Sequence, residues 1–211
     1  MLKNRSIAGF AIVLIGLAPV LRAEGFPSNR EYLTVSAGTA LQQNITLRDD
    51  FGNRADATFK PGFQLGVAVG WESPKGWAFE LETSFIYNAF DKIDGVPVNS
   101  VGDNLEILET PLLFNVLFKP KLTGAWSGYV GVGLGGVATM FYSEQTFWGS
   151  YTTDFTFGYQ GMVGLNYRLD ERWELGLAYK FLGTTDHDLG FGIKSGGTYT
   201  HSFLICVSHT F

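Results

Sequence analysis

The chain has 211 residues, of which 15% are aromatic, 17% are charged and 27 are glycine. The charged fraction lies below the ~25% that is typical of soluble domains, and the length favours a single domain. The net charge of −5 argues against nucleic acid as a partner. Cys206 is the only cysteine, which excludes an intramolecular disulfide.

The first 23 residues have the features of a secretory signal peptide. Lys3 and Arg5 precede an apolar run over 7–21, which is shorter than the ~20 residues of a membrane-spanning helix. Cleavage after Ala23 removes three basic residues and no acidic one, so the mature net charge becomes −8. We therefore expect a signal peptide at 1–23 and one folded domain at 24–211, with an uncleaved anchor helix as the alternative.

Apolar residues alternate with small or polar ones along most of the chain, which predicts strands. The clearest pair is a hairpin at 59–72 and 77–89, joined by the turn signal Ser73-Pro74-Lys75-Gly76. Pro111 interrupts one later strand, where we expect a bulge. The same period predicts further strands at 31–43, 105–119, 126–142, 154–169, 173–182 and 198–211. Short turns alternate with four long polar segments, expected to be loops, at 44–58, 91–104, 143–153 and 183–197.

Volume decides which face of these strands points inward. The interior of an eight-stranded barrel is only wide enough to be filled by side chains, and roughly forty large apolar residues do not fit there. We expect Leu65, Val67, Leu134 and Leu177 to face lipid, while Gly, Ala, Ser and Thr fill the centre. The predicted fold class is all-β, a single eight-stranded antiparallel up-and-down transmembrane β-barrel. A soluble lipocalin-like barrel is the structural alternative.

Aromatic residues gather beside the short turns, as in the interfacial girdles of membrane barrels. They are Trp71, Trp77, Phe118, Trp126, Tyr167, Trp173 and Phe211. Short periplasmic turns and longer extracellular loops are typical of outer-membrane barrels. We therefore expect an integral protein of the bacterial outer membrane, with extracellular loops and periplasmic termini.

Charged residues in mid-strand fall on the small face and are expected inside the barrel. The alternation therefore predicts an interior charge cluster of Glu82, Glu109 and Lys180. Such a cluster either pairs to offset the desolvation of its members or gates a narrow water path. Pairing is the favoured interpretation, because eight strands leave no open lumen.

Two histidine motifs point to chemistry only weakly. Asp186-His187-Asp188 contains metal-ligand residue types, but a tripeptide with one histidine is more typical of a solvated loop. His201 and Ser202 are adjacent in a strand and so face opposite sides, which prevents a base–nucleophile pair. We expect no catalytic residue, no metal and no cofactor.

Four stretches and the closing strand carry a resemblance to a known family. The stretches are Thr110-Pro111-Leu112-Leu113-Phe114-Asn115, Gly158-Tyr159-Gln160-Gly161, Leu165-Asn166-Tyr167-Arg168-Leu169 and Ala178-Tyr179-Lys180-Phe181-Leu182-Gly183. The chain resembles small opacity-type outer-membrane barrels, often called "porin family" or "outer membrane protein beta-barrel domain" proteins. It is also similar to the transmembrane part of outer-membrane protein A. Phe203, Ile205, Val207 and Phe211 resemble the family's assembly signal, from which His209 departs.

The resemblance implies a non-enzymatic outer-membrane barrel that strengthens the envelope and offers its long loops to a surface partner. A narrow porin-like channel for small solutes or ions is the alternative, and a lipid-modifying enzyme is less favoured. The implied partners are outer-membrane lipid, lipopolysaccharide and the barrel assembly machinery. An unidentified extracellular ligand is expected at the loops 44–58, 91–104, 143–153 and 183–197.

Overall fold

The computed structural model describes residues 30–101, 105–120, 122–143, 150–188 and 193–211, so the predicted signal peptide lies outside the described residues. Within this part, no helix has the length and apolarity needed to cross a membrane. The elements are β1 (Arg30–Gln42), β2 (Ile45–Asp49), β3 (Arg54–Phe59), β4 (Gly62–Glu72), β5 (Trp77–Ile93), β6 (Val96–Pro97), the 3-10 turn η1 (Val98–Val101), β7 (Leu105–Phe118), β8 (Trp126–Ser143), β9 (Ser150–Arg168), β10 (Trp173–Thr184), β11 (His187–Asp188), β12 (Ile193–Ser195) and β13 (Tyr199–Thr210).

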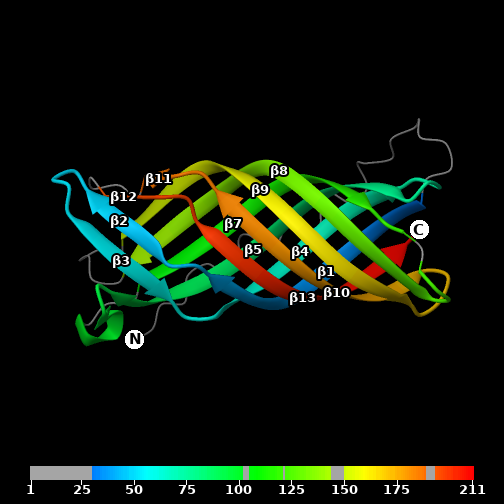
Figure 1. Ribbon diagram of the computed structural model, residues 1–211, viewed down its shortest axis with the longest axis horizontal. Coiled ribbons are helices and arrows are strands. Elements are labelled where there is room, and N and C mark those ends of the chain that lie inside the picture. Colours follow the sequence, from blue (N-terminus) through cyan, green and yellow to red (C-terminus); the bar gives the residue numbers. More distant parts are fainter. Residues whose placement is uncertain (1–29, 102–104, 121, 144–149, 189–192) are drawn as a thin grey trace, which may run out of the picture.

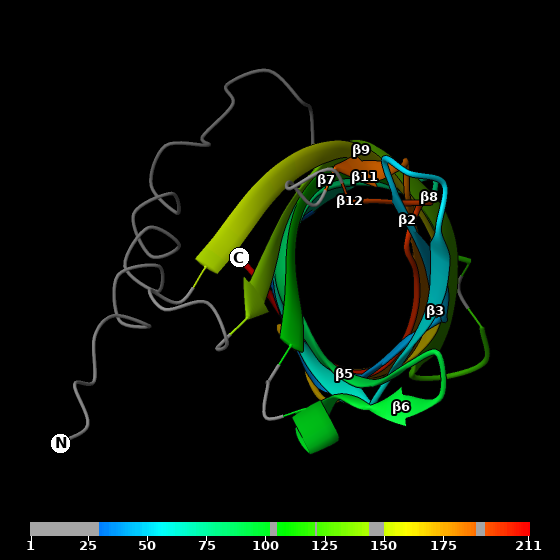
Figure 2. The same ribbon diagram turned by 90° about the vertical axis from the view of Figure 1, so that its left-hand side faces the viewer.

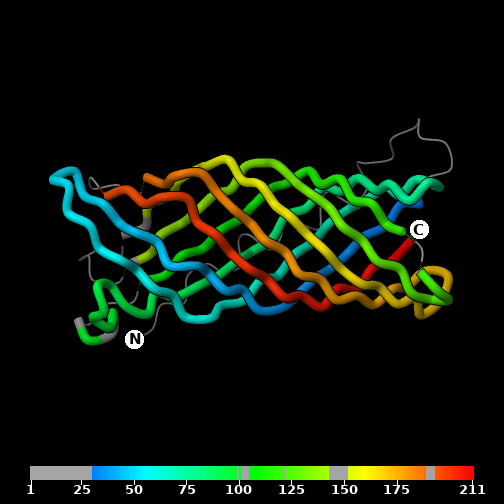
Figure 3. The backbone as a smooth tube through the Cα atoms, viewed as in Figure 1, coloured from blue at the N-terminus to red at the C-terminus, as the bar shows by residue number. Residues whose placement is uncertain are grey.

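Eight long antiparallel strands close into one barrel (Figure 2). The ring runs β1-β4-β5-β7-β8-β9-β10-β13, and β13 pairs back onto β1, with Val35 opposite Val207. The strands cross the barrel at a steep slant (Figure 3). We call the end where β1 begins and β13 ends the short-turn end, and the opposite end the long-loop end. The predicted fold class is confirmed.

Three of the predicted long loops instead contain strands. Segment 44–58 forms the β2–β3 hairpin, β5 continues to Ile93, and β11 and β12 lie within 183–197. These strands form the order β11-β12-β2-β3-β5, named here the rim sheet, which extends the barrel wall beyond the long-loop end (Figure 1). Segment 143–153 is described only in part, and β9 already begins at Ser150. The hairpin carries charged outward residues, so its sequence resembles that of a solvated loop.

The bulky faces of the strands point outward, as predicted. The exposed fractions of the Leu65, Leu134 and Leu177 side chains are 52%, 57% and 63%, whereas Glu82 and Lys180 are buried. Val67 is partly exposed on the same outer face. Apolar side chains therefore cover the outer wall of the closed strands.

The interior is not uniformly small, which corrects the prediction for the inward face. Tyr32, Leu117 and Tyr129 are all buried inside the barrel. Glycines on neighbouring strands make room for the two tyrosine rings: a Cβ at Gly70 would lie 2.3 Å from the Tyr32 ring, and one at Gly164 equally close to the Tyr129 ring. Large and small residues thus interdigitate in a packed interior.

Of two local features predicted from Gly and Pro residues, the turn at Ser73–Gly76 is confirmed and the bulge at Pro111 is not. At the predicted turn, the Gly76 N–H donates to the Ser73 carbonyl at 3.0 Å, and Gly76 has a φ of 82°, which glycine adopts without steric cost. Pro111 does interrupt the pairing of β7 with β5, which stops at Thr83–Leu112 and resumes at Ile86–Glu109. The expected bulge is wrong, because that register is unchanged and Pro111 stays opposite Val137 of β8. A register shift occurs elsewhere, between Thr58 and Phe59 of β3, where the partner on β5 changes from Lys92 to Phe90.

Candidate functional site

Glu82 on β5 and Lys180 on β10 form an ion pair across the barrel interior. Glu82 Oε2 also accepts hydrogen bonds from Asn115 Nδ2 at 2.7 Å and from Gln160 Nε2 at 3.1 Å. These four residues, from four strands, are named here the ion-pair layer. A cation and two amide donors thus compensate the buried carboxylate, as a desolvated charge requires.

The interior beside the ion-pair layer is almost completely filled. The Tyr32 hydroxyl donates to Glu80 Oε1 at 2.7 Å in the interior between the ion-pair layer and the short-turn end. The remaining void, which Lys180 and Cys206 help to line, has a volume of about 30 Å³. That is room for only a few water molecules.

Glu109 does not belong to the same cluster, which corrects the predicted grouping of Glu82, Glu109 and Lys180. Glu109 instead hydrogen-bonds to Thr198, which directly precedes β13, and to Thr200 of β13. An apolar layer lies between the two groups, because Leu113 stands between Glu109 and Asn115 on the inward face of β7. The apolar layer consists of Ala40, Ile86, Leu113, Val137 and Leu182.

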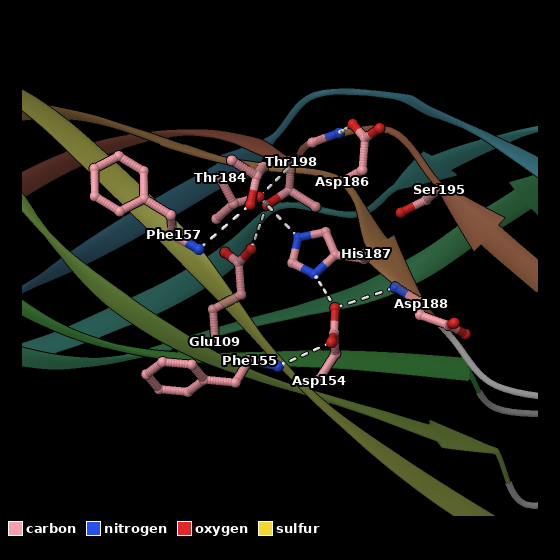
Figure 4. Close-up of polar contacts among 12 residues, drawn as sticks. Glu109, Asp154, Phe155, Phe157, Thr184, Asp186, His187, Asp188, Ser195 and Thr198 are labelled. Atoms are coloured by element: carbon pink, nitrogen blue, oxygen red, sulfur yellow. Dashed lines mark hydrogen bonds and ion pairs between the residues drawn. The ribbon is translucent and has the colours of Figure 1, made fainter.

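A chain of hydrogen bonds leads from Glu109 to the long-loop end (Figure 4). Thr198 Oγ1 lies 2.5 Å from Glu109 Oε1 and 2.9 Å from Thr184 Oγ1. His187 Nε2 lies 2.7 Å from Thr184 Oγ1, and His187 Nδ1 lies 3.2 Å from Asp154 Oδ2. We name these five residues the relay. Its members come from β7, β10, β11 and β9 and, for Thr198, from the residue directly before β13.

His187 is buried, with 2% of its surface exposed, so its interpretation as part of a solvated loop is wrong. Burial lowers the pKa of His187, and the neighbouring Asp154 partly opposes this shift. Both ring nitrogens already have partners. Among the described residues, no group of three or more His, Cys, Asp or Glu side chains is placed to hold a metal ion.

Asp154, His187 and Thr184 have the connectivity of an acid–base–hydroxyl triad. Thr184, however, is 4% exposed, and its hydroxyl oxygen also accepts the Thr198 N–H at 2.8 Å. A nucleophile must reach a substrate, and this hydroxyl is enclosed by its partners. Sequence reasoning missed the relay because Asp154 and Thr184 are ordinary strand residues until pairing brings them to His187.

A cavity of about 600 Å³ lies at the long-loop end beside the relay. The residues around it include His187 and residues of both charge signs from the rim sheet and the β10–β11 turn: Arg48, Asp49, Asp186 and Lys194.

Residues 8–211 match the family described as "Outer membrane protein beta-barrel domain". The chain belongs to this family. No curated protein matches the sequence. An outer-membrane address for this barrel follows from the family and from its lipid-compatible outer face.

Solved structures of other outer-membrane barrels share the fold. Neisserial surface protein A is 13% identical with a TM-score of 0.58, and the match covers 86% of this chain and 97% of that protein. OprG of Pseudomonas aeruginosa is 16% identical with a TM-score of 0.55, covering 87% and 97%. The outer membrane protease OmpT of Escherichia coli is 8% identical with a TM-score of 0.54, covering 89% and 99%. At these identities the likeness shows the fold alone, and the neighbours differ in activity.

The aromatic residues predicted to form the girdle of this outer-membrane barrel lie on its outer wall at the short-turn end. Trp77 packs against Phe118 with ring centroids 5.3 Å apart, and Trp126 packs against Tyr167 at 4.9 Å. His209 stands between Trp173 and Phe211, at 4.6 and 5.0 Å from their rings, so it takes the place of an aromatic residue in this band. Phe203, Ile205, Val207 and Phe211 of the closing strand are all exposed outward.

The His201-Ser202 pair of this outer-membrane barrel is divided between its two faces. Ser202 is buried inside, whereas His201 points outward. His201 Nδ1 lies 2.7 Å from the Tyr179 hydroxyl, and His201 Nε2 lies 2.7 Å from Gln43 Nε2. The two side chains therefore do not act on one another.

Proposed function

We propose that this chain is a sealed, non-enzymatic barrel of the outer membrane that presents its long-loop end as a binding surface. The observation that carries the proposal is the filled interior: the ion-pair layer, the apolar layer and a residual void of about 30 Å³. The rim sheet stands on the extracellular side, and both ends of the mature chain lie in the periplasm, as is usual for bacterial barrels. A rigid wall with a polar rim suits recognition better than transport.

Planar-bilayer conductance tests the sealed barrel. We expect purified wild-type protein, inserted and verified by heat-modifiable gel migration, to give no current above background. The variant Glu82→Ala/Lys180→Ala removes two interior side chains together with their charges and is expected to open a measurable water path. Sizeable, reproducible currents from the wild-type protein would reject the proposal in favour of a narrow porin-like channel, which the charged residues inside the barrel would then serve.

The outward face of the rim sheet supports lipopolysaccharide as a partner. Arg48 stands opposite Arg54 on one side and opposite Lys194 on the other, so three cations form one row across β3, β2 and β12. Like charges directly opposite in a sheet are destabilising, and the acid Asp188 stands opposite Lys194 at one end of the row. Asp56 in the next row is held by the Thr46 hydroxyl at 2.9 Å. Phosphate groups of lipopolysaccharide would relieve the repulsion.

Neutralising this row is expected to weaken binding to immobilised lipopolysaccharide by about tenfold, if each contact contributes about 0.5 kcal/mol. The variant is Arg48→Gln/Arg54→Gln/Lys194→Gln. Lys75→Gln/Arg168→Gln/Arg172→Gln removes the same charge at the short-turn end and serves as the matched control. Equal losses in both variants, or unchanged binding after removal of the lipid phosphates, would count against the row as the contact.

A further inference from the structure

The distances within the relay restrict which of its atoms can donate a proton and which must accept one. Each threonine hydroxyl carries one proton to donate and can accept from others. Thr184 Oγ1 accepts the Thr198 N–H at 2.8 Å and also contacts Thr198 Oγ1 and His187 Nε2. It can donate to only one of these two atoms, so the other atom must donate to Thr184. Only two fully bonded arrangements of the relay remain.

In the first arrangement, Glu109 is a carboxylate. Thr198 donates to Glu109, Thr184 donates to Thr198, and His187 Nε2–H donates to Thr184. His187 Nδ1 faces Asp154 Oδ2, which already accepts the Asp188 N–H at 3.1 Å. Nδ1 must therefore also carry a proton, so His187 is a cation.

In the second arrangement, every hydroxyl is reversed. Glu109 is protonated and donates to Thr198, Thr198 donates to Thr184, and Thr184 donates to His187 Nε2. His187 is then neutral and donates Nδ1–H to Asp154. Both arrangements contain the same number of protons and the same net charge. They differ by the transfer of one proton from Glu109 Oε1 to His187 Nε2, passed on hydroxyl by hydroxyl through Thr198 and Thr184.

We propose that Glu109 and His187 share one proton through the hydroxyls of Thr198 and Thr184, and that this proton fastens β11 to the barrel wall. If the proton is lost, Thr184 has one hydrogen for two acceptors, and one bond of the relay must break. Glu109 and His187 therefore titrate as a pair rather than as two separate groups.

The surroundings of Glu109 favour the second arrangement. Glu109 is buried, and no cation among the described residues forms an ion pair with it. The partners of Glu109 are Thr198, directly before β13, and Thr200 of β13. Around His187, β9 contributes Asp154, β8 contributes the uncharged Phe141 and β12 contributes Ser195. Its own segment adds Asp186 and Asp188, and the adjoining cavity adds Arg48, Asp49, Asp50 and Lys194.

The sign of the pH dependence follows from the proton count. In an unfolded chain, Glu and His have lost their extra protons above about pH 6.5. The folded relay still holds the shared proton there, so the folded state binds more protons than the unfolded one. The attachment of β11 must therefore weaken as pH rises through the titration of the pair.

Nitrogen-15 NMR of the histidine rings in the full-length refolded protein tests the shared proton. At about neutral pH we expect His187 to be protonated on Nδ1 alone, and to change its signal when the pH is raised. Glu109→Gln supplies an amide that always donates to Thr198, so His187 should keep the same tautomer without that alkaline change. Thr198→Val removes the hydroxyl that connects Glu109 to Thr184, so the titration of His187 should no longer depend on Glu109. This variant keeps the test valid if Glu109→Gln refolds poorly.

Infrared spectroscopy supplies the second measurement. The C=O stretch of a protonated carboxyl group should be present in the wild-type protein at neutral pH and missing in Glu109→Gln. A wild-type spectrum without that band, together with a neutral His187, would overturn the proposal. Identical His187 titrations in the wild-type protein, Glu109→Gln and Thr198→Val would overturn it as well, because Glu109 would then hold no proton in common with His187.

Discussion

Replacing Lys180 with methionine is expected to destabilise the folded barrel by about 3–5 kcal/mol, the usual cost of leaving a buried charge without its partner. The methionine keeps the length of the lysine stem, so the lost interaction is mainly electrostatic. Glu82 retains the amide donors of Asn115 and Gln160. It loses its only ion-pair partner among the described residues, and Glu80 remains buried nearby as a second acid.

Urea unfolding of the protein in lipid vesicles, followed by tryptophan fluorescence, measures this change. The double variant Glu82→Gln/Lys180→Met is the matched control, because it removes both charges and leaves the amide network able to pair. We expect it to lose less than half as much stability as Lys180→Met. Equal losses in the two variants would mean that packing, and not the ion pair, determines the effect.

Arginine in place of Leu177 is expected to cost about 2–4 kcal/mol, the penalty for a lipid-facing cation at mid-bilayer. Leu177 lies in the middle of β10, and its side chain is 63% exposed on the outer wall. Leu169 is similarly exposed, at 60%, but follows β9 at the short-turn end beside the aromatic band. Leu169→Arg should therefore cost only about 0–1 kcal/mol, since the penalty falls toward the interface.

The two leucines have similar exposed fractions, so a difference between the two variants reports the depth of the side chain in the membrane and not its exposure. The same unfolding assay in vesicles serves for both variants. If Leu177→Arg were as mild as Leu169→Arg, the outer wall would not meet hydrocarbon, and a soluble barrel would become the better description of the fold.

Several features of the site depend on strand stagger, which local sequence does not encode. The inward direction of Glu82, Glu109 and Lys180 follows from period two along each strand. Their heights do not, because the tilt and shear of a closed barrel decide which residues meet across it. Glu109 therefore lies beyond the apolar layer, bonded to Thr198, and not beside Lys180. The relay was missed for the same reason, since Asp154 and His187 meet only through the closed sheet.

The amino-acid sequence by itself determined the number of long strands, the lipid-facing side of each and the aromatic band at the short turns. These follow from side-chain alternation and volume, which are properties of single strands. Only the tertiary structure decided that segment 44–58 forms part of the rim sheet, that His187 is buried, and that Glu82 pairs with Lys180 while Glu109 does not. The reason is that closing the sheet sets the register between strands far apart in the chain, and register selects the partner of every inward side chain.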